Sequence, residues 1–329
     1  MRKRKVYKAR GRARGTGRSI AAAGRVLRKK PSTKEAPHNY DTLLLNRLVL
    51  RQGEPTRRHL QLQELLYAYA PELSELAFKY GFGLGAEAYR ISGGGMGALE
   101  RLMYNSGFGR MVYHVSESRS VLAFSGVDPM GESTRANMHV FQAGVISGYL
   151  SAHSRRRIYA REEGCAFNGA KSCVFVARPH GYVEETRPAL GFTAVLNAMD
   201  SAIGRGMRNA SSDSYVLAMG PFFGEPLLSE ASRFLYMAGK QLSKGGGALD
   251  GRIKAIAGFL GIKSASVNVS KNVASAVTLS YDHATSVRGF VELTAAFVSG
   301  FVKGRMGVSP RVQRSVSRTG AYIIRLLLK

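Results

Sequence analysis

The chain has 329 residues, with 48 Lys and Arg against 22 Asp and Glu, which gives a formal charge of +26. A protein this basic typically meets a polyanion, so we expect nucleic acid or an anionic membrane surface as its partner. No stretch approaches the ~18–20 apolar residues of a membrane span, and the basic N-terminus lacks the apolar core of a signal peptide. The chain has only two cysteines, too few for a disulfide scaffold, so we expect a cytoplasmic protein.

The first segment is almost purely basic: residues 1–34 carry fourteen Lys or Arg and no acid. Such a segment cannot bury a core and is expected to stay extended until an anionic partner orders it. Its composition resembles the extensions by which ribosomal proteins thread into ribosomal RNA. We predict a largely extended nucleic-acid-binding arm and linker over residues 1–58; a solvated terminus or a targeting signal is the alternative. The arm residues predicted to contact phosphates are Arg2, Lys3, Arg4, Lys5, Lys8, Arg10, Arg12, Arg14, Arg18, Arg25, Arg28, Lys29 and Lys30.

The remainder of the chain contains similar landmarks twice, in the same order and about 150–155 residues apart. They are PELSE at 71–75 and PLLSE at 226–230, GMGALE at 95–100 and GGGALD at 245–250, GFG at 107–109 and GFLG at 258–261, and SGY at 147–149 and SGF at 299–301. We therefore predict a first domain over 59–182, a bridging helix and linker over 183–211, and a second domain over 212–329. Convergent use of Gly-rich turns is the alternative explanation.

Each repeat is expected to be α+β. A helix follows the Pro-x-Leu-Ser-Glu start, a second helix precedes two strand-like runs, and a long helix leads to a closing β-hairpin. The expected strands are 110–116 and 120–127 in the first repeat, and 264–270 and 274–281 in the second. Gly-rich stretches at 81–86 and 92–97 lack the Gly-Lys-Ser/Thr ending of a phosphate loop, so we expect hinges between helices there.

Both cysteines lie in the closing hairpin of the first repeat, in REEGCAFNGAKSC at 161–173. The Asn-Gly pair at 168–169 predicts a tight turn that places Cys165 and Cys173 nearly opposite each other. Gly164 permits a bulge that could bring Glu162 to the same face, and His139 on the preceding helix could supply a fourth ligand. Sulfur, nitrogen and carboxylate donors in a closed set suit zinc, and only the first repeat has them. Two reduced core cysteines or a cross-strand disulfide remain as alternatives.

The Glu-x2-Cys-x7-Cys spacing, after a ligand-bearing helix and before the strand VFVA, resembles the 4-vinyl reductase domain over about 120 residues. The resemblance implies an antiparallel sheet packed with helices, related to the TRAPP vesicle-tethering subunits. It also implies zinc bound through Glu162, Cys165, Cys173 and His139, a small apolar ligand beside the metal, and dimerisation. Two copies of a dimer-forming domain in one chain suggest an intramolecular pseudo-dimer.

The second repeat lacks the cysteines and the carboxylate, and Val291 sits where His139 would recur. Residues 240–329 hold fourteen Lys or Arg against three acids, so we interpret this degenerate repeat as a phosphate-binding surface; a solvated charged face is the alternative. Its candidate contacts are Arg311, Arg314 and Arg318. A further basic cluster, SRRR at 154–157, could add to an RNA surface.

We find no Ser-His-Asp or paired-carboxylate arrangement, and therefore expect no enzyme. The leading hypothesis is a ribosome-associated or archaeal ribosomal protein that docks on ribosomal RNA through its basic arm and second repeat, beside neighbouring ribosomal proteins. The first alternative is a regulator that senses a small apolar ligand in the first repeat. The second is a tethering factor at an anionic membrane.

Overall fold

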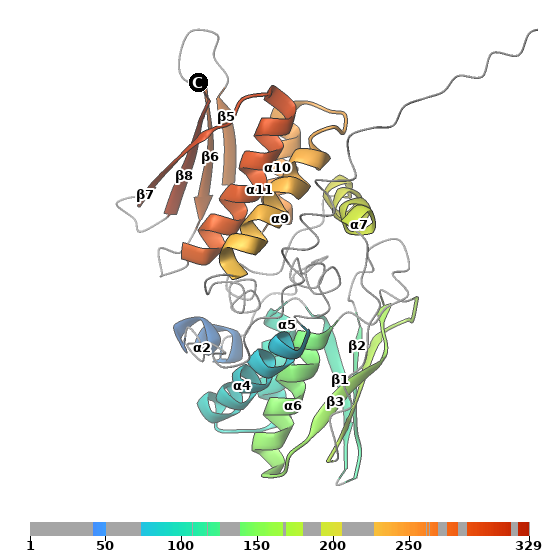
Figure 1. Ribbon diagram of the computed structural model, residues 1–329. Helices are drawn as coiled ribbons and strands as arrows, with labels where there is room; N and C mark the ends of the chain where they lie inside the picture. Colours follow the sequence, from blue (N-terminus) through green and yellow to red (C-terminus); the bar gives the residue numbers. More distant parts are fainter. Residues whose placement is uncertain are drawn as a thin grey trace, which may run out of the picture.

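The structure is a computed structural model with two α+β units (Figure 1). The residues that it describes are 42–50, 74–106, 108–116, 118–125, 139–166, 169–179, 192–205, 227–260, 262, 264–268, 275–281, 288–316 and 322–328. Among them, no helix is both long and apolar enough to cross a bilayer.

The described part of the first unit places four helices beside a four-stranded antiparallel sheet. Its strand order is β1-β2-β4-β3, so the two closing strands form a hairpin whose second strand pairs with β2. The elements are α2 (Thr42–Leu50), α4 (Ser74–Ser92), α5 (Met96–Asn105), β1 (Arg110–Val115), β2 (Ser120–Ser125), α6 (Val140–Ser154), β3 (Tyr159–Gly164) and β4 (Cys173–Arg178).

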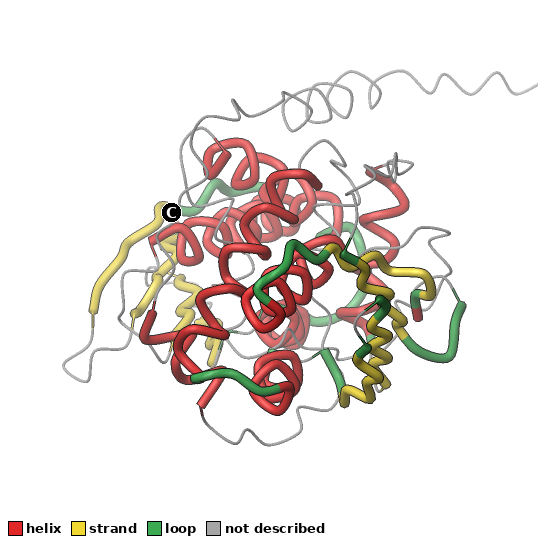
Figure 2. Tube along the Cα trace, turned by 90° about the horizontal axis from the view of Figure 1, so that it is seen from below, coloured by secondary structure: helices red, strands yellow, loops and turns green. Residues whose placement is uncertain are grey.

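The second unit repeats this arrangement with the strand order β5-β6-β8-β7. Its elements are α7 (Phe192–Gly204), α9 (Leu227–Leu242), α10 (Leu249–Phe259), β5 (Ser264–Asn268), β6 (Ser275–Tyr281), α11 (Arg288–Met306), β7 (Arg311–Val316) and β8 (Tyr322–Leu328). The predicted fold class, two antiparallel sheets each packed with helices, is confirmed. Figure 2 shows the helices grouped together with the strands toward the outside.

Part of the predicted arm belongs to the first unit. Helix α2 buries Leu45, Leu48 and Val49, and two polar side chains of α5 hold it in place. Nε of Arg101 donates a hydrogen bond to the carbonyl of Val49 at 3.0 Å, and Nδ2 of Asn105 donates to that of Leu48 at 2.8 Å. The expectation of an extended segment up to residue 58 is therefore wrong for residues 42–50. These residues form a helix whose apolar side chains are buried where α2 packs against α4 and α5. The rest of residues 1–58 lies outside the described part.

The predicted bridging segment contains helix α7, which ends at Gly204 and packs on α9 and α10 of the second unit. The ring of Phe192 meets that of Phe234 on α9 with centroids 5.5 Å apart, and Asp200 pairs with Arg252 on α10. The buried apolar side chains of both units belong to one continuous cluster. The domain boundaries and the pseudo-dimer remain predictions.

Close backbone contact between α4 and α6 organises the first unit. A Cβ added at Gly85 would lie closer than 3.0 Å to the backbone of Val145 and Tyr149. A Cβ added at Gly148 would lie equally close to the backbone of Phe82. The predicted hinge at 81–86 is therefore wrong, since these glycines lie inside α4 and admit the neighbouring helix. The Gly-rich turn after Ser92 does separate two helices, as predicted.

The second unit repeats this contact at matching positions. A Cβ at Gly239 of α9 would collide with the backbone of Phe297 and Phe301, and one at Gly300 of α11 with that of Tyr236. Gly300 occupies the place that Gly148 has in the first SGY/SGF landmark. The same pair of helices is thus pressed together in the same way twice, which supports an internal repeat.

We expect Gly85→Ala to destabilise the protein by about 1–3 kcal/mol, because the added methyl group meets rigid backbone. Gly251→Ala, in α10, is the control: apart from its chain neighbours and the adjacent backbone of α10, no atom lies within 4 Å of an added Cβ, so it should stabilise by about 0.5–1 kcal/mol. Urea unfolding of both variants measures the difference. Equal stability of the two variants would contradict the packing described for α4 and α6.

Candidate metal centre

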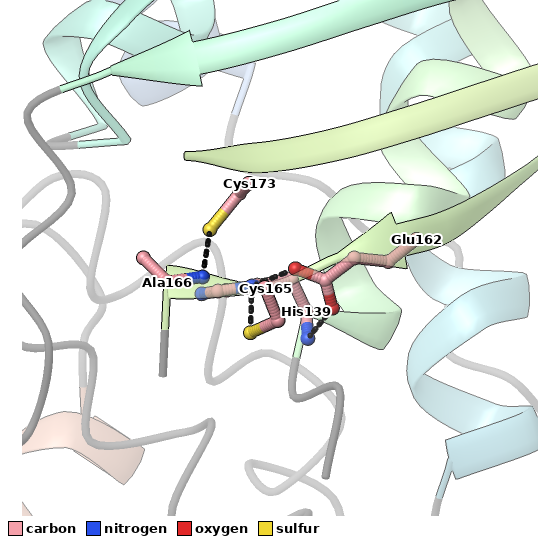
Figure 3. A network of polar contacts seen from close by, with 5 residues as sticks. All are labelled: His139, Glu162, Cys165, Ala166 and Cys173. Carbon is pink, nitrogen blue, oxygen red and sulfur yellow. Dashed lines mark hydrogen bonds and ion pairs between the residues drawn. The ribbon is translucent and has the colours of Figure 1, made fainter. Parts of the chain in front are cut away.

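Four potential ligands meet inside the first unit. His139, Glu162, Cys165 and Cys173 are all buried, and one donor atom from each lies within 4.8 Å of the others. Figure 3 shows the four side chains converging where α6 begins and the β3–β4 hairpin turns. The cluster could hold a metal ion.

Glu162 reaches the cluster because β3 carries a bulge. Glu162 pairs with Phe175 while Gly164 pairs with Val174, so Glu163 is the extra residue between them. The bulge shifts the alternation of side chains and lets Glu162 and Cys165 point to one side. This is the bend expected at Gly164.

Glu162 also fixes the start of α6. Its Oε2 accepts a hydrogen bond from the backbone N–H of His139, the N-cap residue, at 3.2 Å. Its Oε1 lies 2.6 Å from Nδ1 of His139, which donates to it when the carboxylate is ionised. A carboxylate at a helix N-terminus is favoured by the helix dipole. The cluster therefore joins the sheet to the helix even before a metal is considered.

The two sulfur atoms complete the donor set. Sγ of Cys165 lies 3.5 Å from Nδ1 of His139, and the backbone N–H of Ala166 donates to Sγ of Cys173 at 3.3 Å. Both cysteines are free thiols, so the alternative of a disulfide is not observed. The turn residue Asn168 lies outside the described residues, but Gly169 has φ of +87°, as a tight turn requires.

Burial disfavours the ionised forms of Glu162 and Cys173. Burial raises the pKa of Glu162, against the influence of His139, which lowers it. The hydrogen bond with Cys165 and burial together raise the pKa of Cys173 far above its usual range. A divalent cation would favour the charged form of both groups, because it supplies the missing positive charge.

The donor set fits zinc. Metal–ligand bonds of about 2.0–2.3 Å place the ligand atoms of a tetrahedral site about 3.3–3.8 Å apart. The separation between Cys165 and His139 falls in that range. The separation between His139 and Glu162 is shorter, because the two atoms share a hydrogen bond, so both can bind one ion only if that hydrogen bond is broken.

An aromatic shell encloses the cluster on one side. The ring of Phe108 meets that of His139 edge-on, with centroids 4.7 Å apart, and also contacts Phe124 and Phe175. Sequence reasoning missed this shell. Its signal was the period of two along β4, which puts Phe175 on the same face as Cys173.

The second unit has aliphatic side chains on the corresponding inner face. Leu279 pairs with Ile324 and Val277 with Leu326, and all four are buried. Val291, eight residues before the shared Ser-Gly pair as His139 is in the first unit, is also buried. The described residues of the second unit include no histidine or cysteine.

The candidate nucleic-acid residues are only partly described. Arg311 and Arg314 are exposed on the edge strand β7, but three positions apart in a strand places them on opposite faces of the sheet. The arm residues Arg2 to Lys30 and Arg318 lie outside the described part of the chain.

No family model and no curated protein matches the chain. Several solved structures are similar to part of it. A vinyl-4-reductase family protein from Methanocaldococcus jannaschii is 14% identical, with a TM-score of 0.27; the match covers 50% of this chain and 92% of that one. The phenol-responsive sensory domain of the transcription activator PoxR, with phenol, is 17% identical, with a TM-score of 0.31, over 42% of this chain and 89% of that one. Likeness at these scores carries no argument about function.

We expect the purified protein to bind about one divalent metal ion per chain, and Cys165→Ser to abolish this binding because a sulfur donor is lost. Elemental analysis after dialysis against zinc measures the ratio. His114→Ala, which alters an exposed histidine on β1, should keep the metal. A metal content that Cys165→Ser leaves unchanged would place the ion elsewhere.

Proposed function

We propose that the first unit is a zinc-binding module and that the chain is a non-enzymatic binding protein. The observation that carries this proposal is the buried cluster of one histidine, one carboxylate and two thiols. This mixture of donors suits zinc better than magnesium or calcium, which prefer oxygen ligands alone.

The zinc ion would act as a structural clip. His139 begins α6, Glu162 lies on β3, and the two cysteines flank the hairpin turn, so one ion would tie three segments together. Four protein ligands leave no open position for substrate or water. When bound, zinc would therefore supply folding free energy rather than Lewis-acid catalysis.

The partner that we propose for this protein is RNA. The supporting observation is the charge of +26, concentrated in residues 1–34 with fourteen basic residues and no acid. The exposed Arg311 and Arg314 add two cations to the second unit. Lys and Arg contacts to phosphates bind without reading sequence, which suits docking on ribosomal RNA next to ribosomal proteins.

A second candidate is a sensor of a small apolar ligand. It is favoured by the rings of Phe108, Phe124 and Phe175 beside His139, which would offer apolar contacts next to a metal. Saturable binding of phenol that depends on Cys165 would support this function. Binding of RNA without any response to phenol would favour the first.

Deletion of residues 1–34 should weaken RNA binding strongly and flatten its dependence on salt, since each lost phosphate contact lowers the slope of log K against log salt by about 0.7–0.9. Fluorescence anisotropy with labelled RNA over a salt series measures both quantities. A truncated chain with the slope of the full chain would exclude the arm as the RNA contact.

A further inference from the structure

The turn that follows α6 contains an unusual residue. Arg155, the C-cap of α6, has φ of 55° and ψ of 24°, and it is the one non-glycine residue with positive φ in the described part of the chain. The left-handed region is unfavourable for a residue with a Cβ, and glycine is the usual solution at this position of a helix. The fold therefore tolerates local strain to keep an arginine here.

The second unit shows how the same turn is made without strain. Gly307 follows the shared Ser-Gly pair at the same distance as Arg155 does in the first unit, and its φ is +73°. Open space surrounds the position where a Cβ would stand on Gly307. Glycine thus suffices for this turn, and the guanidinium of Arg155 is not required to build it.

Backbone and hydroxyl groups hold the first turn in shape. Oγ of Ser154 accepts a hydrogen bond from the backbone N–H of Arg156 at 3.2 Å and donates to the carbonyl of Leu150 at 2.8 Å. Oγ of Ser151 accepts from the N–H of Ile158 at 2.8 Å, where the chain enters β3. No guanidinium takes part in these contacts.

Three consecutive arginines, 155–157, are exposed on this turn. Among the described residues, none of the three is in an ion pair, whereas Arg119 and Arg178 both approach Glu163 at 3.9 Å. The guanidinium of Arg157 lies over the ring of Tyr159, 5.6 Å from its centroid. A single arginine would be enough to interact favourably with the dipole at the C-terminal end of α6. The other two arginines of the turn therefore need another explanation.

We propose that this arginine turn, Arg155–Arg157, binds the phosphate backbone of RNA. Guanidinium groups pair with phosphate oxygens through two parallel hydrogen bonds, and a ring under Arg157 limits the freedom that would be lost on binding. The turn leads directly into β3, which carries Glu162, so the metal cluster and the arginine turn share one rigid strand. The inference rests on the proposed RNA function and adds a second contact surface to the arm.

Arg155→Gly separates binding from folding. The variant should keep or raise the Tm, by up to about 3 °C, because glycine relieves the strain. It should weaken binding of an oligouridine RNA about five-fold at moderate salt and lower the salt slope by about 0.7–0.9, as expected for one phosphate contact. A merely structural arginine would change stability and leave the slope as it was.

Arg233→Ala is the charge-matched control, since Arg233 is exposed on α9 of the second unit. If Arg155→Gly weakens RNA binding no more than Arg233→Ala does, the arginine turn is not a contact, and RNA binding by the arm still stands. If the wild-type chain binds phosphatidylserine vesicles but does not bind RNA, the proposed function fails together with the inference. A salt slope that falls by about 0.7–0.9 in Arg155→Gly but not in Arg233→Ala supports the inference.

Discussion

The glycine contact between α4 and α6 is the constraint on which the first unit depends. Gly85 and Gly148 let the two backbones touch, and this sets how closely α6 packs against α4. At the start of α6, Glu162 on the bulged strand accepts hydrogen bonds from His139. The second unit uses Gly239 and Gly300 in the same way. The same glycine-mediated contact between two helices therefore occurs in both units, although the side chains buried beside it differ.

The two units differ in the side chains that they bury beside the sheet. The first unit encloses a carboxylate, an imidazole and two thiols, a combination that is costly in a low-dielectric interior unless it is paired or bound to a cation. The second unit fills the corresponding face with aliphatic side chains such as Leu279 and Ile324. Since the aliphatic solution packs well in the same fold, the polar cluster is not needed for the fold itself. A bound metal ion gives it a physical reason to exist.

Sequence patterns predicted the strands, the closing hairpins and the four side chains that meet in the buried cluster, because alternation, an Asn-Gly turn and cysteine spacing are local signals. They failed where tertiary contact decides. The glycines at 81–86 look like a hinge by propensity, yet they lie in α4 because a neighbouring backbone needs the space. The sequence also did not predict helix α2 or the left-handed backbone of Arg155. The first depends on burial against α5 and the second on a strained turn, and neither produces a periodic pattern in the sequence.

X-ray absorption at the zinc edge of the purified, full-length protein tests the central claim most directly. Two sulfur neighbours at about 2.3 Å and two nitrogen or oxygen neighbours at about 2.0–2.1 Å would match His139, Glu162, Cys165 and Cys173 as ligands of one ion. A shell of nitrogen and oxygen alone, or protein that retains no zinc, would contradict it. In that case the cluster would be a buried hydrogen-bonded network, and the first unit would owe its stability to packing.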